Sequence, residues 1–280
     1  MFRLLLYVDV KNEPGRRWLR DIYRVHQRLW MMFPDDEQVK KDEFFLGAWK
    51  GPALEEPNPN RRKAGFLFRI EQDGKPRILV QSVERPNWQY AFQNAPYLLA
   101  KEPKYEEFEY SAHCDKTCRF RLLANVVRSK SVVDPNGRVR TTHKGGHTIP
   151  IRRRTEVVIR PNPVSEVLPC EPVEREKIIS GRWDPWREWL KKMGRQHGFE
   201  VLDNKDSPLL MEGVHVSVRK PSKNGAESAK DKAIDKHYNG GLFNGKLVCS
   251  DPEKLRNALI NGVGHGKAFG FGLLSVAPVK

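Results

Sequence analysis

Short apolar or alternating stretches recur in the first 112 positions of the chain, and they predict strands rather than helices. The predicted strands are Phe2–Val10, Gly65–Gln72, Arg77–Val83 and Tyr105–Tyr110. Asp73-Gly74 lies between the second and the third, and this dipeptide favours a hairpin turn. Apolar residues spaced three or four apart predict one long helix over Arg16–Phe33, and a shorter helix is expected within Trp88–Leu99.

The second half of the chain shows the same order of elements with insertions. The expected strands are Cys118–Arg128, Val214–Arg219, Lys246–Cys249 and Leu273–Val276. The expected helices are Asp184–His197 and Pro252–Asn261, capped by Asp184 and Asp251, and Gly198 ends the first. A Lys-, Ser- and Ala-rich stretch, Lys220–Lys236, is expected to be a mobile insertion.

The order β-α-β-β-α-β in both halves predicts an α+β protein made of two tandem ferredoxin-like (RRM-like) domains. Each domain should have an antiparallel sheet with helices on one face. The predicted boundaries are residues 1–112 and 118–280, so the helix at Arg16–Phe33 belongs to the first domain.

The charge of the chain indicates the kind of partner it binds. Its 280 residues include 50 Lys and Arg against 35 Asp and Glu, which gives a formal net charge of +15 and a pI near 9.7. Such an excess is typical of proteins that bind a polyanion, above all nucleic acid, because each phosphate contact releases a condensed counterion. A solvated basic surface is the alternative.

Membrane, disulfide and metal features are weak in this sequence. No stretch approaches the ~18 consecutive apolar residues of a transmembrane helix, and the start MFRLLLYVDV lacks a signal-peptide cleavage site. We therefore expect no membrane partner and a cytoplasmic location. The four cysteines are too few for a disulfide framework, and a zinc site at His113, Cys114 and Cys118 lacks a second ligand pair. We expect no metal and no cofactor.

The predicted helix at Arg16–Phe33 divides into three stripes at about 100° per residue. One is apolar and belongs against a sheet, one consists of arginines, and one is mixed. The apolar stripe consists of Trp18, Ile22, Val25, Leu29 and Met32, and the arginine stripe of Arg17, Arg20, Arg24 and Arg28. The mixed stripe consists of Leu19, Tyr23, His26 and Trp30. Four arginines without matched acids favour phosphate contacts, and Arg24 and Arg28 are the candidates nearest His26.

His26 lies one turn from Tyr23 in the mixed stripe. An imidazole with a pKa near 6.5 suits proton transfer at neutral pH, and RNA carries its own nucleophile in the 2′-hydroxyl. A histidine in such a place is also common as a satisfied group at the edge of a core. The helix alone leaves both interpretations open.

The sequence NGVGHGKAFGFGLLSV near the C-terminus places glycines at 262, 264, 266, 270 and 272. They follow a predicted helix and lead into a strand, whereas the dinucleotide-binding motif follows a strand and opens a helix. Glycines allow backbone amides to approach a ligand, and His265 and Lys267 add positive charge to the same loop. A flexible glycine turn is the alternative.

The spacing G-h-G-x5-G-h-G at Gly262–Gly272, where h is apolar, resembles the signature of the RAMP superfamily of CRISPR-associated RNA-binding proteins. The ending KAFGFGLLSV and the early stretch YRVHQRLWMMFP are similar to the CasE endoribonucleases of the type I-E Cascade complex. One segment lies at each end of the chain, and the middle fits in outline only.

The resemblance implies a pair of ferredoxin-like domains and a metal-independent endoribonuclease that cleaves CRISPR repeat stem-loop RNA on the 3′ side of its hairpin. Other Cascade subunits are the further implied partners. His26 matches the family's catalytic histidine, and Tyr23 matches the tyrosine that assists it. The implied reaction is attack by the 2′-hydroxyl, which leaves 2′,3′-cyclic phosphate and 5′-hydroxyl ends.

RNA-binding residues are expected in three places. In the glycine loop they are Gly262, Gly264, Lys267, Gly270 and Gly272. On the helix they are Arg24 and Arg28. The basic segment Arg138–Arg160 supplies Lys144, Arg152, Arg153 and Arg154, which match in charge and position the family's stem-gripping hairpin; a solvated basic loop is the alternative. The cation that stabilises the phosphorane is left open among Arg24, Arg28, Lys144 and Lys267.

Two rival functions use the same features. A RAMP protein that binds CRISPR RNA without cutting it would share the glycine loop and the arginines, and only His26 with Tyr23 argues against it. A metal-dependent nuclease would need converging carboxylates, and Asp35-Asp36 and Glu55-Glu56 lie in polar loops without such a pattern.

Overall fold

The computed structural model describes residues 1–34, 46, 65–72, 74–109, 117–128, 131–133, 139–141, 157–158, 185–220 and 234–279. The first part of the chain contains β1 (Phe2–Tyr7), α1 (Glu13–Arg20), α2 (Ile22–Trp30), β2 (Phe66–Glu71), β3 (Arg77–Ser82), α5 (Trp88–Phe92), the 3-10 helix η1 (Pro96–Leu98) and β4 (Lys104–Glu107). The second part contains β5 (Cys118–Ala124), β6 (Val127–Arg128), β7 (Ser131–Val133), β8 (Val139–Thr141), β9 (Val157–Val158), α7 (Pro185–His197), β10 (Phe199–Leu202), β11 (Leu210–Lys220), β12 (Ile234–Cys249), α8 (Pro252–Asn261), the 3-10 helix η3 (Lys267–Phe269) and β13 (Leu274–Pro278).

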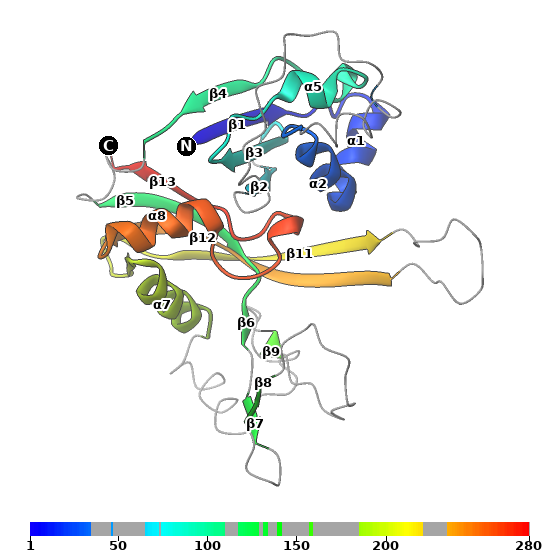
Figure 1. The fold of residues 1–280 in the computed structure, drawn as a ribbon. Coiled ribbons are helices and arrows are strands. Elements are labelled where there is room, and N and C mark those ends of the chain that lie inside the picture. Colours follow the sequence, from blue (N-terminus) through cyan, green and yellow to red (C-terminus); the bar gives the residue numbers. More distant parts are fainter. Residues whose placement is uncertain are drawn as a thin grey trace.

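The first sheet has the strand order β2-β3-β1-β4, and its pairings are antiparallel. This is the order of a ferredoxin-like domain, with the first and third strands at the centre, so the predicted β-α-β-β-α-β arrangement is confirmed. Helices α1, α2 and α5 lie on one face of the sheet (Figure 1). Leu6, Phe68 and Val80 point to that face and are buried beneath the helices.

The prediction of one continuous helix over Arg16–Phe33 was wrong, because the chain forms two helices that meet at Asp21. Asp21 has φ −97° and ψ 86°, which is outside the helical region, and its N–H still bonds to the carbonyl of Trp18. Its side chain accepts from the backbone N–H of Arg24 at 3.1 Å, and this caps α2. The first helix also begins earlier than predicted, since Asn12 caps it through the N–H of Gly15 at 2.7 Å.

The second sheet has the order β10-β12-β5-β13, and β11 pairs with the remaining length of β12. Elements β5, α7, β10, β12, α8 and β13 therefore repeat the ferredoxin-like order in the second domain. Its core is apolar and contains Phe120, Leu122, Trp186, Leu190, Phe243, Leu255, Leu259 and Leu274, together with Cys118. The division at residues 1–112 and 118–280 stays a prediction; each sheet takes its strands from one side of it.

The long hairpin of β11 and β12 departs from the sequence prediction. Strand β12 starts at Ile234 and β11 extends to Lys220, so the predicted insertion Lys220–Lys236 is partly strand. The hairpin projects beyond the second sheet and passes under α2 of the first domain (Figure 1). Val218 is buried there, and Val216 and Tyr238 pack against the first core, so the second domain completes the core that carries α2.

Short two-stranded ladders, β6 with β9 and β7 with β8, extend from the second domain away from the first (Figure 1). None of the described helices is long and apolar enough to cross a bilayer.

Candidate active site

Helix α2 places His26 over the edge of the first sheet. Ile22, Val25 and Leu29 are buried and hold the helix against the centre of the sheet. Strand β2 is an edge strand of this sheet, so a residue on the flank of α2 meets β2 at the border of the core. The position of His26 therefore follows from the helix phase that buries these apolar residues.

The imidazole of His26 lies among aromatic rings. Its centroid is 5.3 Å from that of Phe66 and 6.0 Å from that of Phe68, with interplanar angles of 29° and 26°. Trp30, one turn further along α2, is 6.2 Å from His26 and 5.6 Å from Phe66. The ring is thus held on one side by β2 and stays partly exposed.

Burial lowers the pKa of the His26 imidazole below its ordinary value of 6.5. Its Nδ1 atom is buried and has no hydrogen-bond partner among the residues that the structure describes. A histidine with a lowered pKa is neutral at physiological pH, and a neutral imidazole can accept a proton. The environment therefore suits a general base better than a permanent cation.

Tyr23 lies one turn before His26 on α2 and is partly buried against the same core. The structure thus keeps the predicted pair on one helix, with Tyr23 towards its N-terminal end. Helix α2, which carries both residues, lies where the first domain meets the second, because it contacts both η3 and β11.

The arginines of the predicted stripe have more partners than the sequence suggested. Arg17 pairs with Glu13 at 2.5 Å and Arg24 pairs with Asp21 at 3.2 Å, so the expectation of arginines without matched acids was wrong for these two. Both pairs are exposed and contribute little to stability. Arg24 therefore remains available for a phosphate.

Arg28 is held by the protein itself. Its Nη1 donates to the carbonyl of Ala91 at 2.8 Å and to Oδ1 of Asn94 at 2.8 Å, at the end of α5. This arrangement fastens α2 to α5. It favours a structural role for Arg28 over the predicted contact with RNA.

The glycine loop packs on itself and on the first domain. The N–H of Val263 donates to the carbonyl of Gly272 at 2.9 Å, and the N–H of Gly272 donates to Leu123 at 2.7 Å. Gly262 has φ +75°, and a Cβ atom there would lie 2.9 Å from a methyl of Leu67 on β2. Close packing is therefore one reason for these glycines.

Burial divides the predicted ligand-binding glycines into two groups. Gly262, Gly270 and Gly272 are buried against protein, and a Cβ on Gly270 would touch Phe68 and Ile22. Gly264 is half-buried beside Trp189. The accessible residues of the loop are 264 to 269, between the buried Gly262 and Gly270, and they include Lys267. The structure thus brings the loop from one end of the chain against α2 from the other.

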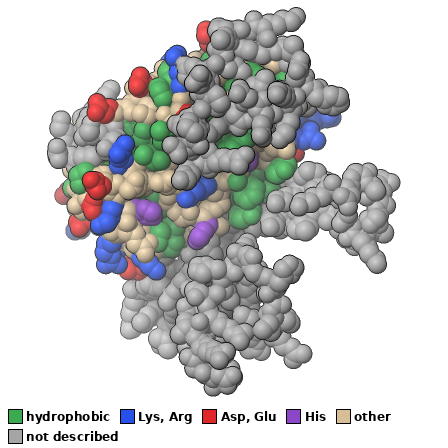
Figure 2. Space-filling model, viewed as in Figure 1, with side chains coloured by type: hydrophobic (Ala, Val, Ile, Leu, Met, Phe, Trp, Pro, Cys, Tyr) green, Lys and Arg blue, Asp and Glu red, His purple; other side chains and the backbone are tan. Residues whose placement is uncertain are grey.

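Lys267 is half-buried, and burial lowers the pKa of its ammonium group. Burial also lowers the pKa of His197 at the end of α7, and the nearby charge of Lys267 lowers it further. Lysine, arginine and histidine side chains share the face on which α8 and the loop lie (Figure 2). The sequence did not predict the proximity of His197 and Lys267, which are separated by three strands and a helix.

Other predicted site residues lie elsewhere or outside the described part. Lys144, Arg152, Arg153 and Arg154 lie outside the described residues. A cavity of about 580 Å³ lies between α1, the end of β2 and β11, and its charged lining includes Arg16, Arg20, Arg121, Glu71 and Glu212. His26 and Tyr23 do not line this cavity. No group of three or more His, Cys, Asp and Glu side chains in the described part could hold a metal ion.

Comparison with known proteins places the chain in a family. The family model described as CRISPR associated protein matches residues 1–278. The chain belongs to this family of CRISPR-associated proteins.

Two curated relatives of this CRISPR-associated protein are more narrowly named. CRISPR-associated endoribonuclease Cse3 of Thermus thermophilus is 27% identical over 205 residues, which cover 72% of this chain and 74% of that one. CRISPR system Cascade subunit CasE of Escherichia coli is 24% identical over 271 residues, 95% of this chain and 96% of that one. The resemblance to CasE proteins predicted from the two terminal segments is confirmed.

Solved structures confirm the fold of this CRISPR-associated protein. A structure of CRISPR endoribonuclease Cse3 bound to a 19-nucleotide RNA superposes with a TM-score of 0.57 at 22% identity, and covers 99% of this chain and 100% of that one. A crystal structure of a CRISPR-associated protein from Thermus thermophilus gives 0.53 at 20% identity, with the same coverage. The two-domain ferredoxin-like architecture is therefore shared.

Proposed function

We propose that this protein is a CasE-type endoribonuclease that binds the hairpin of CRISPR repeat RNA and cleaves it to give mature CRISPR RNA, as a subunit of Cascade. The names of the two curated relatives, an endoribonuclease and a Cascade subunit, support this function. A net charge of +15 supports a polyanionic substrate. A cytoplasmic location belongs to the same proposal.

The observation that carries the proposal is the environment of His26. Its imidazole is desolvated by Phe66 and Phe68, stays partly exposed, and lies on the helix that contacts the glycine loop. A core histidine without a function would more commonly have both nitrogens satisfied or solvated. Since Nδ1 is buried, Nε2 is the nitrogen left to face a substrate.

The reaction that suits this site needs no metal. Nε2 of His26 accepts the proton of a ribose 2′-hydroxyl, the 2′-oxygen forms a bond to the adjacent phosphorus, and the bond from phosphorus to the 5′-oxygen breaks. The 5′-oxygen takes up a proton and leaves as a 5′-hydroxyl, so the other product ends in a 2′,3′-cyclic phosphate. Tyr23 is the candidate for donating that proton or for holding the phosphate in place.

Positive charge near the phosphate would stabilise the phosphorane and hold the RNA. Arg24 and Lys267 are the described candidates, because Arg28 is held by Ala91 and Asn94. Lys144, Arg152, Arg153 and Arg154 remain the candidates for gripping the stem. A-form RNA has a deep and narrow major groove, so these contacts should go mainly to phosphates.

The test is cleavage of a repeat hairpin RNA in the presence of EDTA by the wild-type chain, His26→Ala and Gln27→Ala. Gln27 is exposed next to His26 on α2 and serves as the matched control. We expect wild type and Gln27→Ala to cleave, and His26→Ala to be slower by about 10²–10⁴-fold with RNA binding retained.

Each contrary outcome points to a different alternative. Cleavage by His26→Ala at the wild-type rate contradicts the role of His26. Loss of wild-type cleavage in EDTA contradicts the metal-independent reaction. Binding without any cleavage, with or without a divalent metal, favours a RAMP subunit that binds CRISPR RNA in an effector complex.

A further inference from the structure

Strand β2 has two different faces. Phe66 and Phe68 point towards α2, and Leu67, Arg69 and Glu71 point to the opposite face, against the second domain. Arg69 is 2% exposed and is among the largest fully buried side chains that the structure describes. A buried guanidinium is costly unless it is paired with an opposite charge and hydrogen-bonded, so its partners show what it holds.

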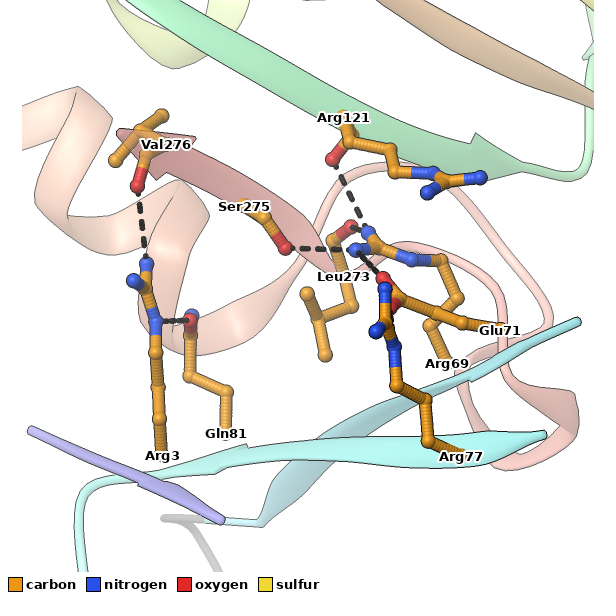
Figure 3. A network of polar contacts seen from close by, with 9 residues as sticks. All are labelled: Arg3, Arg69, Glu71, Arg77, Gln81, Arg121, Leu273, Ser275 and Val276. Atoms are coloured by element: carbon orange, nitrogen blue, oxygen red, sulfur yellow. Dashed lines mark hydrogen bonds and ion pairs between the residues drawn. The ribbon is translucent and has the colours of Figure 1, made fainter. Parts of the chain in front are cut away.

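The guanidinium of Arg69 joins the two domains (Figure 3). Its Nη1 donates to the carbonyls of Arg121 at 3.2 Å and Leu273 at 3.1 Å. Its Nη2 donates to Oε1 of Glu71 at 2.7 Å and to Oγ of Ser275 at 3.0 Å. Three of these four acceptors belong to the second domain, on β5, on β13 and immediately before β13.

Glu71 keeps Arg69 in this orientation. The other oxygen of Glu71, Oε2, accepts from Nε of Arg77 at 2.7 Å, so the carboxylate lies between two arginines. Burial raises the pKa of Glu71, but the hydrogen bonds and charges of Arg69 and Arg77 lower it more, and the net pKa lies below the ordinary value. The group is therefore a carboxylate at neutral pH and compensates the buried charge of Arg69.

The acceptor at Leu273 is directly next to Gly272, the last glycine of the loop. Arg69 therefore holds the end of the glycine loop, and the bond from Gly272 to Leu123 fixes that end to β5. On the other face of β2, Phe68 contacts the ring of His26 and lies beside Gly270. Adjacent residues of one strand thus hold the loop and the imidazole.

We propose that Arg69 is a positioning residue, which sets the place of the glycine loop of the second domain relative to the imidazole of His26. This inference rests on the proposed function. RNA that is held by the loop meets His26 in the productive geometry only when the two domains keep this relative position. A displacement of about 1 Å at a reacting centre costs on the order of 100-fold in rate.

Arginine suits this role better than lysine. Its planar guanidinium carries donors in a fixed fork and can reach four acceptors at once, whereas an ammonium has three donors on a flexible stem. Arg69→Lys keeps the charge beside Glu71, but with one donor used there only two remain for the three acceptors at Arg121, Leu273 and Ser275. The Arg69→Lys variant therefore tests the fixed geometry of the guanidinium separately from its charge.

The experiment compares Arg69→Lys with Arg77→Lys, a matched control on the same sheet face that also holds Glu71 but has no partner in the second domain among the bonds described above. Single-turnover cleavage of the repeat hairpin is measured at saturating protein. Affinity is measured with a hairpin that carries a 2′-deoxy nucleotide at the cut. For Arg69→Lys we expect a rate lower by about 10–100-fold with affinity within about threefold, and for Arg77→Lys a rate within about threefold.

A second measurement keeps the test decisive if Arg69→Lys folds poorly. Ser275→Ala removes one acceptor of Arg69 and leaves its charge pair intact, so it should lower the rate by a few-fold and increase hydrogen exchange in residues 262–273 without changing affinity. Equal rates for wild type, Arg69→Lys and Ser275→Ala would overturn the inference, and so would parallel losses of rate and affinity. Absence of cleavage by the wild-type chain would instead refute the proposed function.

Discussion

The two faces of strand β2 differ in what they require of their residues. Phe66 and Phe68 support His26 through apolar contact, which has no strong directional preference. Arg69, paired with Glu71, holds the second domain through hydrogen bonds, which are directional. We therefore expect the apolar face to govern stability and the pKa of His26, and the polar face to govern how the two domains are positioned.

The largest effect should come from breaking the apolar face. Phe68 is fully buried, and Phe68→Ala should lower the free energy of unfolding by about 3–5 kcal/mol, because it leaves a cavity under α2. Urea denaturation measures this. Phe120→Ala in the other core is the control, since it should destabilise the protein to a similar extent without changing the cleavage rate of the folded fraction. A loss below about 1 kcal/mol for Phe68→Ala would contradict this packing.

The next effect concerns Gln81 on β3, which lies on the same face of the sheet as Leu67 and Arg69 but bonds to α8 instead of the glycine loop. Nε2 of Gln81 donates to the carbonyl of Leu259 on α8 at 2.6 Å, and Oε1 of Gln81 accepts from Nε of Arg3 at 3.2 Å. Gln81→Leu should cost about 1–3 kcal/mol of unfolding free energy, because it leaves a buried carbonyl without this donor. Gln27→Leu, on the exposed side of α2, should stay within about 0.5 kcal/mol. Equal stability of the two variants would show that this interface bond contributes nothing.

A smaller effect should separate two arginines on α2. Arg28→Ala should lower stability by about 1 kcal/mol, because two hydrogen bonds to α5 are lost. Arg24→Ala should leave stability nearly unchanged and reduce the salt dependence of RNA binding by about one unit of slope. Denaturation and binding at several salt concentrations measure both. The assignment fails if Arg28→Ala alone changes the salt slope.

The smallest effect concerns the pKa of His26. A general base acts in its neutral form, so burial, which lowers this pKa, keeps the site active below pH 6.5. The rate should therefore fall only when pH drops below that value. Phe66→Leu admits water to the ring and should move the acidic midpoint up, towards 6.5, by less than about one unit. Single-turnover rates on both sides of pH 6.5 test this, and a wild-type midpoint above 6.5 would be contrary to a desolvated base.

The sequence predicted the fold well where local patterns were strong. Alternation along Gly65–Gln72 and Arg77–Val83 and the turn between them located β2 and β3, and Asp251 was correctly predicted to cap α8. The break at Asp21 was missed because the apolar spacing continues in phase through both helices. The early part of β12 was missed because its residues are mostly polar and pair only with β11, in the projecting part of the hairpin.

The candidate site was predicted only in part. His26, Tyr23 and the glycine loop could be named as candidates because their spacing resembles a known family. The phenylalanines against His26 could be placed on one face of a predicted strand, but not beneath that helix. Arg69 carried no signal at all, since a charged residue in a strand looks exposed until the partner domain is known. Contacts between domains are set by tertiary packing, which local periodicity does not contain.

Attack by the 2′-hydroxyl with His26 as the base is tested most directly by the ends that the wild-type chain produces from a repeat hairpin RNA in EDTA. Mass spectrometry should find a 2′,3′-cyclic phosphate (or its opened 3′-phosphate) and a 5′-hydroxyl. A single 2′-deoxy nucleotide at the cut should abolish the reaction. Cleavage of the deoxy substrate, or a 5′-phosphate on the product, would contradict proton abstraction from the 2′-hydroxyl by His26.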